Sequence, residues 1–433
     1  MRRLFIGILL ASGFSVPLFA QGMVSAHPPI SAGDTAWMLM STALVMLMTP
    51  GLAFFYGGLV RKKNVLGVLM QCMMALAVLS VMWVLVGYSL SFATGTPYIG
   101  SLKLAGLVGI GMGPSLYAPK IPAIVFVLFE MMFAVITPAL VAGAFVERMK
   151  FSAYIAFIVL WSLAVYYPVC HWVWGKGGWL AAMGVRDFAG GIVVHITAGF
   201  AALVTAVYIG RRKNSLHIPT PHNLPFTVLG AAILWFGWFG FNAGSALGAN
   251  AISANAFLAT NTSAAIAAIV WAILDRITTG KSTLLGTATG AVAGLATVTP
   301  ASGFVTVWGA LAIGASTALI CYFMIAAVKP KFKFDDTLDA FGVHGMGGLW
   351  GTLMVGVFAV PSIDGVRGLV AGAARQLEVQ ALASLITVAY TVVATFLIIK
   401  LIDVTLGVRV PDREEAIGLD LAQHNERAYT LVD

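Results

Sequence analysis

The sequence is dominated by long apolar runs without charged residues, such as residues 65–93 and 304–328. A run of about 20 apolar residues is long enough to cross a bilayer as a helix. The 433 residues are 60% hydrophobic and only 10% charged, whereas a soluble domain has about 25% charged residues. The runs lack the period-two alternation of a transmembrane β-barrel. The sequence therefore predicts an all-α polytopic membrane protein.

The apolar runs that follow the N-terminal segment predict eleven transmembrane helices. The last of them is followed by a polar tail from residue 407. The predicted spans are residues 35–57, 65–93, 121–143, 150–171, 188–210, 225–243, 252–274, 283–299, 303–328, 341–360 and 380–406.

The basic residues lie mainly in every second loop, and cytoplasmic loops are enriched in Lys and Arg. One set of loops carries thirteen: Arg61, Lys62, Lys63, Arg148, Lys150, Arg211, Arg212, Lys213, Arg276, Lys281, Lys329, Lys331 and Lys333. The other set carries six: Lys103, Lys120, Lys176, Arg186, Arg367 and Arg375. This bias predicts an N-terminus outside the cell and a cytoplasmic C-terminus. The net charge of +8 is thus a topology signal rather than a nucleic-acid footprint.

The N-terminus has the pattern of a secretory signal peptide. Arg2 and Arg3 precede the apolar stretch "LFIGILLASGFSVPLFA", and cleavage after Ala20 or Ala26 fits the small-residue rule. A retained first helix is the alternative. We therefore expect a signal peptide over residues 1–26, a membrane domain over 27–406 and a cytoplasmic tail over 407–433.

Two of the predicted spans contain a histidine preceded by a carboxylate and followed by small residues. "DFAGGIVVHITAG" spans residues 187–199 and includes His195, and "DAFGVHGMGG" spans 339–348 and includes His344. The motifs fall on the fifth and tenth spans, which run in opposite directions. This arrangement indicates an inverted repeat of five plus five helices with one extra helix, a symmetry common in transporters.

The two histidines lie deep in apolar sequence, where ionisable groups are rare and usually face a cavity or the bundle interior. Three interpretations of this histidine pair are open. The first is that both are core histidines with satisfied hydrogen bonds, and the second is that they are facing ligands of a haem iron. The third is that they form a polar pair lining a narrow path. In the last case each neutral imidazole offers one donor and one acceptor without adding charge, and the neighbouring ring can hold the complementary tautomer.

Other candidate residues have both structural and functional interpretations. Asp187, just before its helix, suits an N-cap, or it stabilises a cation through its field. Trp174, Phe133, Phe241 and Ser245 lie near span ends, where an interfacial aromatic belt is expected. A cation can also be held over a tryptophan face, with a serine hydroxyl as acceptor.

Several longer motifs resemble the ammonium transporter family (Amt, of the Amt/Rh superfamily). The resemblance extends from about residue 34 to the C-terminus. The motifs are "PGLAFFYGGLVRKKNVL", "FAVITPALVAGAFVERMKFSA", "DFAGGIVVHI", "PHNLPFTVLGAAILWFGWFGFNAGS", "GVHGMGGLWG" and "LGVRVPDREEAIGLDLAQHNERAY".

The resemblance implies roles for individual residues. Phe133, Trp174 and Ser245 match the external ammonium site, in which the tryptophan stacks on the cation and the serine accepts a hydrogen bond from it. Phe133 and Phe241 match the two rings that close the pore mouth. His195 and His344 match the twin pore histidines, and Asp187 matches the family aspartate.

The resemblance also implies a mechanism and partners. Ammonium would lose its proton at the pore mouth, and ammonia would pass the histidines. Potassium cannot lose a proton and would be excluded. The implied protein is an inner-membrane homotrimer with one pore per subunit, whose tail is contacted by a PII-type signalling protein. No cofactor, metal or enzymatic activity is expected, and methylammonium would serve as a substrate analogue.

Glu130 is a further candidate, with two interpretations. It lies inside the third span, where related chains often carry glutamine. It is either a protonated or hydrogen-bonded interior carboxyl, or it takes part in proton handling beside Phe133.

Three other functions fit the sequence less well than ammonium transport does. An Rh-like channel for neutral gas is disfavoured because Trp174 and Ser245, which recognise the cation, are present. An ammonium sensor usually carries an added cytoplasmic output domain, for which a tail of about 27 residues has no room. A haem enzyme with two histidine ligands would show a visible absorption band.

Overall fold

The computed structural model describes residues 29–213 and 221–429, and over these ranges the chain is helical with no strand. The predicted signal peptide lies outside the described residues and stays a prediction. The α-helices are α1 (Ala32–Leu59), α2 (Val65–Met82), α3 (Tyr88–Phe92), α4 (Ala123–Val141), α5 (Phe151–Trp161), α6 (Tyr167–Val173), α7 (Trp179–Ala182), α8 (Thr197–Ile209), α9 (Leu224–Gly244), α10 (Ala251–Thr279), α11 (Leu284–Val298), α12 (Val307–Phe323), α13 (Lys329–Phe332), α14 (Met346–Phe358), α15 (Pro361–Asp364), α16 (Arg375–Leu406), α17 (Asp412–Ile417) and α18 (Leu419–His424).

The observed helices can be compared with the eleven spans predicted from the sequence. Ten helical stretches in the described ranges are long and apolar enough to cross a membrane. The shorter apolar helix α11, with 15 residues, coincides with the predicted eighth span. The structure is therefore consistent with eleven spans, and it confirms an all-α membrane protein.

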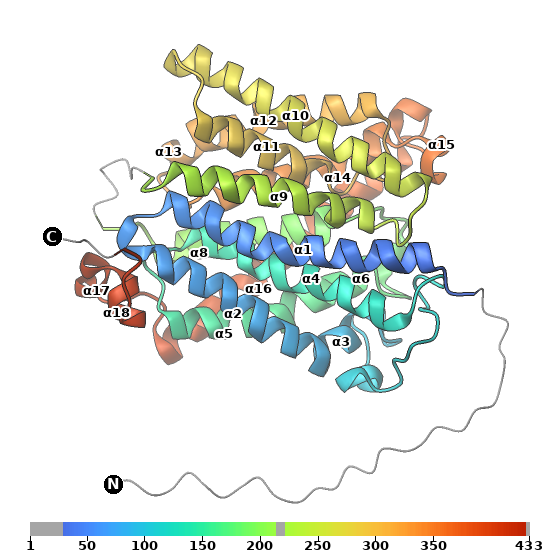
Figure 1. Ribbon diagram of the computed structural model, residues 1–433, viewed down its shortest axis with the longest axis horizontal. Coiled ribbons are helices and arrows are strands. Elements are labelled where there is room, and N and C mark those ends of the chain that lie inside the picture. The colour runs from blue at the N-terminus through green and yellow to red at the C-terminus, as the bar shows by residue number, and fades with distance from the viewer. Residues whose placement is uncertain (1–28, 214–220, 430–433) are drawn as a thin grey trace, which may run out of the picture.

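The helices pack side by side into one bundle (Figure 1). The C-terminal helices α17 and α18 lie at one end of it, which we call the tail face. The first residues of α1 and the short helices α3 and α15 lie at the opposite end, which we call the vestibule face. Helix α1 packs along α9, and the two begin the two halves of the predicted repeat.

The repeat is visible in local irregularities of corresponding helices. The fourth and ninth spans each contain a π-helical turn, at Ser162–Tyr166 and Met324–Val328. The fifth and tenth spans each begin with one, at Gly191–Ile196 and Phe341–Gly345. These last two turns carry His195 and His344. π-Helical turns are rare and frequently mark functional sites.

The fifth and tenth spans cross at glycines. A side-chain carbon added at Gly199 would collide with the backbone of Gly345, and one added at Gly348 would lie 2.6 Å from Cβ of His195. Small residues at membrane helix crossings let the backbones approach closely. The glycines that follow each histidine in the sequence therefore bring the two π-helical turns together.

Candidate functional site

A cavity of about 390 Å³ opens at the vestibule face. Five of the residues predicted from the sequence line it, although they come from separate parts of the chain. They are Glu130, Phe133, Trp174, Asp187 and Ser245. The structure thus brings together Phe133, Trp174 and Ser245, which the resemblance assigned to an external site, and adds Glu130 and Asp187 to the same wall.

Trp174 and Ser245 are each fixed by one backbone hydrogen bond. The indole Nε1 of Trp174 donates to the carbonyl of Asp187 at 2.8 Å, and the hydroxyl of Ser245 donates to the carbonyl of Phe241 at 2.9 Å. A hydroxyl that has used its proton in this way still has lone pairs with which to accept. The site can therefore offer an aromatic ring and an acceptor oxygen to a cation.

Two phenylalanines separate this vestibule from the interior. The ring centroids of Phe133 and Phe241 lie 4.3 Å apart, and those of Phe133 and Trp174 lie 5.9 Å apart in a T-shaped arrangement with an interplanar angle of 89°. Phe133 lines the vestibule, whereas Phe241 lines a second, inner cavity. The ring pair thus lies at the junction of the two spaces.

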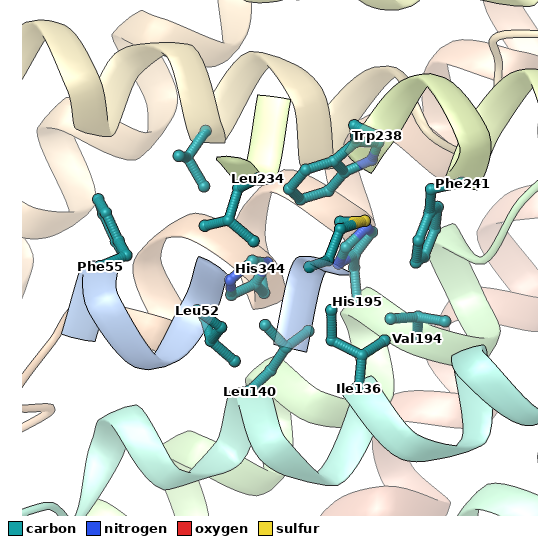
Figure 2. A pocket seen from close by; sticks show the side chains of 12 residues that line it. Leu52, Phe55, Ile136, Leu140, Val194, His195, Leu234, Trp238, Phe241 and His344 are labelled. Carbon is teal, nitrogen blue, oxygen red and sulfur yellow. The ribbon is translucent and has the colours of Figure 1, made fainter. Parts of the chain in front are cut away.

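The inner cavity is narrow and apolar, with His195 and His344 among its lining residues (Figure 2). Its free volume is about 10 Å³, close to the least that holds one water-sized molecule. The other side chains around it are aliphatic, aromatic or thioether: Met48, Leu52, Phe55, Ile136, Leu140, Val194, Leu234, Trp238, Phe241 and Val292.

The two imidazole rings face each other across this space. Their centroids are 5.2 Å apart and their planes differ by 13°. Both rings are almost fully buried, and within the described part of the chain neither nitrogen of His195 has a hydrogen-bond partner. Buried polar atoms without a partner are uncommon. The rings are stacked and do not bond to each other, so the free nitrogens of His195 are left available to a small polar molecule.

Trp238 belongs to this site but was not singled out from the sequence. Its ring lies 5.7 Å from that of His195 at an angle of 25°, and its Nε1 donates to Thr299 Oγ1 at 2.9 Å. His195 is therefore held between Trp238 and His344. The residue lies within the motif "WFGWFGFNAGS", where several aromatic residues compete and the pattern alone does not select one.

The carboxylate of Asp187 accepts hydrogen bonds from the backbone at the start of the fifth span. Its Oδ1 accepts from the backbone N–H groups of Gly190 and Gly191 at 2.9 and 2.6 Å. Its Oδ2 accepts from those of Ile192 and Val193 at 2.7 and 3.1 Å. The first N–H groups of a helix have no partner within the helix, and this carboxylate satisfies four of them. Asp187 is therefore placed to fix the turn that carries His195.

The corresponding carboxylate of the second half is Asp336. It accepts from Ala340 and Phe341 N–H at 3.1 and 2.7 Å and precedes His344 by eight residues, as Asp187 precedes His195. Asp339, the carboxylate in the motif "DAFGVHGMGG", does not take this capping position. Asp339 has φ of 60° and forms an ion pair with Lys329 instead.

Glu130 lies in the vestibule wall and is 8% exposed. One of its carboxyl oxygens, Oε2, is buried and has no hydrogen-bond partner among the described residues. This geometry places Glu130 beside Phe133 but leaves both interpretations from the sequence open.

The tail face contains an ion-pair cluster that the sequence did not predict. Glu147 pairs with Arg61 at 3.0 Å and with Arg212 at 2.8 Å, and Arg212 also pairs with Asp335 at 2.9 Å. Burial disfavours ionisation of Glu147, but Arg212 and Arg61 outweigh it and hold its pKa below the ordinary value. Burial also disfavours ionisation of Asp335, but Arg212 and Arg148 outweigh it and lower the pKa of Asp335 to about 2.

The polar tail is docked against this cluster. Backbone hydrogen bonds join Lys150 N–H to the Val408 carbonyl at 2.9 Å and Val410 N–H to the Arg148 carbonyl at 3.0 Å. Farther along, Asp420 Oδ1 accepts from Gly67 N–H at 2.8 Å, near the start of α2. Residues 407–424 are therefore a packed part of the bundle.

These features define a multi-pass membrane protein with a wide vestibule, an aromatic constriction and a narrow apolar passage. The profile of the Ammonium Transporter Family matches residues 36–429. An ammonium transporter of Bacillus subtilis is 47% identical over 399 residues, which cover 92% of this chain and 98% of that protein.

Solved structures agree with the sequence comparison. Mep2 of Candida albicans has a TM-score of 0.85 and 36% identity, covering 92% of this chain and 90% of that one. A structure titled "Sensor Amt Protein" has a TM-score of 0.84 and 29% identity, covering 90% and 98%. The chain belongs to the ammonium transporter family. The family supports ammonium transport as its function and confirms the expectation of a transporter rather than an enzyme.

Proposed function

We propose that the protein recruits ammonium in the vestibule, removes its proton near Phe133 and Phe241, and passes ammonia through the inner cavity. The observation that carries the proposal is the order of the two cavities. A vestibule with an aromatic face and an acceptor oxygen leads through a ring pair to an apolar passage with two imidazoles.

The recruitment step uses Trp174, Phe133 and Ser245. A cation over a desolvated tryptophan face gains about 2 kcal/mol. Trp174 lines the vestibule with its ring orientation fixed by the bond to the Asp187 carbonyl. Ser245 Oγ has donated its proton to Phe241, so its lone pairs remain for an ammonium N–H.

The passage step depends on charge. Transferring an unpaired cation into an apolar space is very unfavourable, and the inner cavity has almost no polar lining apart from the two imidazoles. Its free volume of about 10 Å³ has no room for a hydration shell. Ammonia can form hydrogen bonds with the free nitrogens of His195. Potassium has no proton to lose and is excluded.

The test is methylammonium uptake, potassium uptake and electrical current in proteoliposomes. Wild type should carry ammonium-dependent current and exclude potassium. His195→Asp puts a negative group in the passage, so potassium should begin to permeate, and the symmetric variant His344→Asp should do the same. His195→Ala should lower the current without admitting potassium. If all four proteins exclude potassium equally and carry the same current, the mechanism is wrong. Uptake without current would instead indicate a channel for neutral gas.

The expected topology and assembly belong to the same proposal. The vestibule face would lie outside the cell and the tail face in the cytoplasm, as the basic loops indicate. The signal peptide would be removed, and three copies would form a homotrimer in the inner membrane. Protease accessibility of a tag after residue 433 in inverted vesicles, and the mass of the complex in native mass spectrometry, test these points.

The docked tail is proposed to regulate transport and to take part in binding a PII-type signalling protein. Its contacts with Arg148, Lys150 and Gly67 tie it to the ends of spans near the tail face. Removing residues 408–433 should reduce flux or abolish inhibition by PII while the trimer stays intact. Normal flux together with normal inhibition in the truncated protein would contradict this role.

A further inference from the structure

Glu130 is a buried carboxyl group of the vestibule to which the transport steps above give no role. It lies in α4, one helical turn before Phe133, and residues three apart on a helix are neighbours on its surface. Its side chain lines the vestibule cavity and is 8% exposed. Glutamate is rarely buried without a partner, yet Oε2 of Glu130 has none among the described residues. A partner from outside the protein would satisfy it.

The neighbouring side chains of the vestibule have already used their protons. The hydroxyl of Tyr117, which also lines the cavity, donates to the Phe92 carbonyl at 2.7 Å. Trp174 and Ser245 each donate to a backbone carbonyl as well. A phenol, an indole and a hydroxyl have one proton each. None of these three side chains therefore has a proton left for the carboxyl group of Glu130.

The other charged residues of the lining differ from Glu130 in exposure or in bonding. Both oxygens of Asp187 accept backbone N–H groups of the fifth span. Asp364 and Arg186 also line the cavity, but their side chains are exposed. Among these lining residues, Glu130 thus combines burial with an oxygen that has no bond.

The inner part of the vestibule therefore offers hydrogen-bond acceptors together with aromatic faces. Ser245 has free lone pairs, and Glu130 keeps an acceptor oxygen whether its carboxyl is ionised or not. The rings of Phe133 and Trp174 lie 5.9 Å apart beside them. A ligand that suits this set donates several hydrogen bonds and accepts none, and a small ammonium ion has four N–H groups and no lone pair. Hydrogen bonds between ionised partners are about twice as strong as neutral ones.

We propose that Glu130 is a substrate-binding residue, whose carboxyl group accepts an N–H of the ammonium ion held by Trp174 and Ser245. The residue raises the affinity of the vestibule for small cations that carry N–H groups. This inference rests on the proposed recruitment step and extends it, because the site gains a second acceptor that is acidic.

The first test is the kinetics of methylammonium uptake in proteoliposomes. Glu130→Gln keeps an acceptor oxygen but removes the acidic group, and Glu130→Met removes both while preserving the length of the side chain. KM should rise roughly tenfold in Glu130→Gln, which corresponds to about 1.4 kcal/mol, and further in Glu130→Met, with little change in the maximal rate. An unchanged KM in both variants would overturn the proposal. So would a lower maximal rate at unchanged KM, because it would place Glu130 in proton release rather than in binding.

Asp364→Asn is the matched control, since it removes an acidic group from the exposed part of the same vestibule. It should change KM by no more than about twofold, because exposed charges are screened by water and salt. An equal rise of KM in Asp364→Asn and Glu130→Gln would show a general attraction of cations and overturn the specific contact. Trp174→Leu tests the recruitment step separately, so the proposed function stands if only the Glu130 variants behave like wild type.

The second test observes the contact without transport. Infrared difference spectra of the protein in lipid, with and without ammonium, should contain a change in a carboxyl stretching band. The change should be missing in Glu130→Gln and retained in Asp364→Asn. Its absence from wild type, or its persistence in Glu130→Gln, would overturn the proposal.

Discussion

The two halves of the molecule repeat one device in different surroundings. In the first half, Asp187 binds four backbone N–H groups at the start of the turn that carries His195. In the second half, Asp336 binds two at the start of the turn that carries His344. The first turn opens on an aromatic vestibule, and the second lies behind a cluster of ion pairs. The symmetric part lines the inner cavity, and the parts that differ are the vestibule on one side and the ion-pair cluster of the tail face on the other.

A substitution in the ion-pair cluster of the tail face should have the largest effect on stability. Arg212→Ala would leave Glu147 and Asp335 as buried charges without their shared partner. Breaking a buried ion pair from one side costs roughly 3–5 kcal/mol. Thermal unfolding in detergent should show a large loss, whereas Arg211→Ala, at the exposed neighbouring position, should have little effect. Equal unfolding temperatures for both variants would refute the importance of the cluster.

Removing the two capping carboxylates compares the halves directly. Asp187→Ala leaves four N–H groups without an acceptor and Asp336→Ala leaves two. Losing a helix N-cap costs about 0.5–2 kcal/mol, because the turn relaxes and water reaches part of the freed N–H groups. We expect Asp187→Ala to lower the free energy of unfolding more than Asp336→Ala. A larger loss from Asp336→Ala would reverse the comparison.

Lowering the pH should change the contributions of Asp335 and Asp336 to the free energy of unfolding in opposite directions. The pKa of Asp335 is held at about 2, so its contribution is present above about pH 4 and is lost as pH falls through 2. The full contribution is about 2 kcal/mol. Burial, with Asp339 nearby and Lys329 opposing, raises the pKa of Asp336 to about 6, so its protonation favours the folded state as pH falls through 6.

The measurement is unfolding between pH 7 and pH 3 for two variants. Asp335→Asn retains only the effect of Asp336 and should gain stability on acidification relative to wild type. Asp336→Asn retains only that of Asp335 and should lose stability below about pH 4. Parallel curves for the two variants would show that these groups do not differ as described.

A substitution in the vestibule should produce the smallest free-energy change of these predictions. The change should affect the recognition of ammonium rather than the stability of the fold. Trp174→Leu removes about 1–2 kcal/mol of cation–π attraction, roughly a tenfold change in ammonium discrimination. Trp172→Leu, two residues away and outside the vestibule lining, is the matched control. Unchanged selectivity in a correctly inserted Trp174→Leu protein would mean that the vestibule site is assigned wrongly.

The sequence predicted the spans well because a helix in lipid must form its backbone hydrogen bonds within itself and expose apolar side chains to the lipid. Each span therefore appears as one continuous apolar run in the sequence. The helices observed agree with the eleven predicted ranges within a few residues. The histidine motifs also pointed to two rings that the structure places face to face, because glycines that permit a close crossing stand next to each of them.

The remaining details depend on how loops fold in three dimensions. Asp339 is nearer to His344 in sequence than Asp336, yet the left-handed backbone at Asp339 turns its side chain to Lys329. Arg212 pairs with Glu147 and Asp335, which are separated from it in the sequence by 65 and 123 positions.

The contact between Phe133 and Phe241 has a consequence for the cell that makes the protein. With the ring centroids 4.3 Å apart, the two side chains fill the junction between the vestibule and the inner cavity. If the proposed route is correct, a copy with its rings in contact would offer ions no continuous open path. Many such copies could then share one membrane without acting as a standing leak.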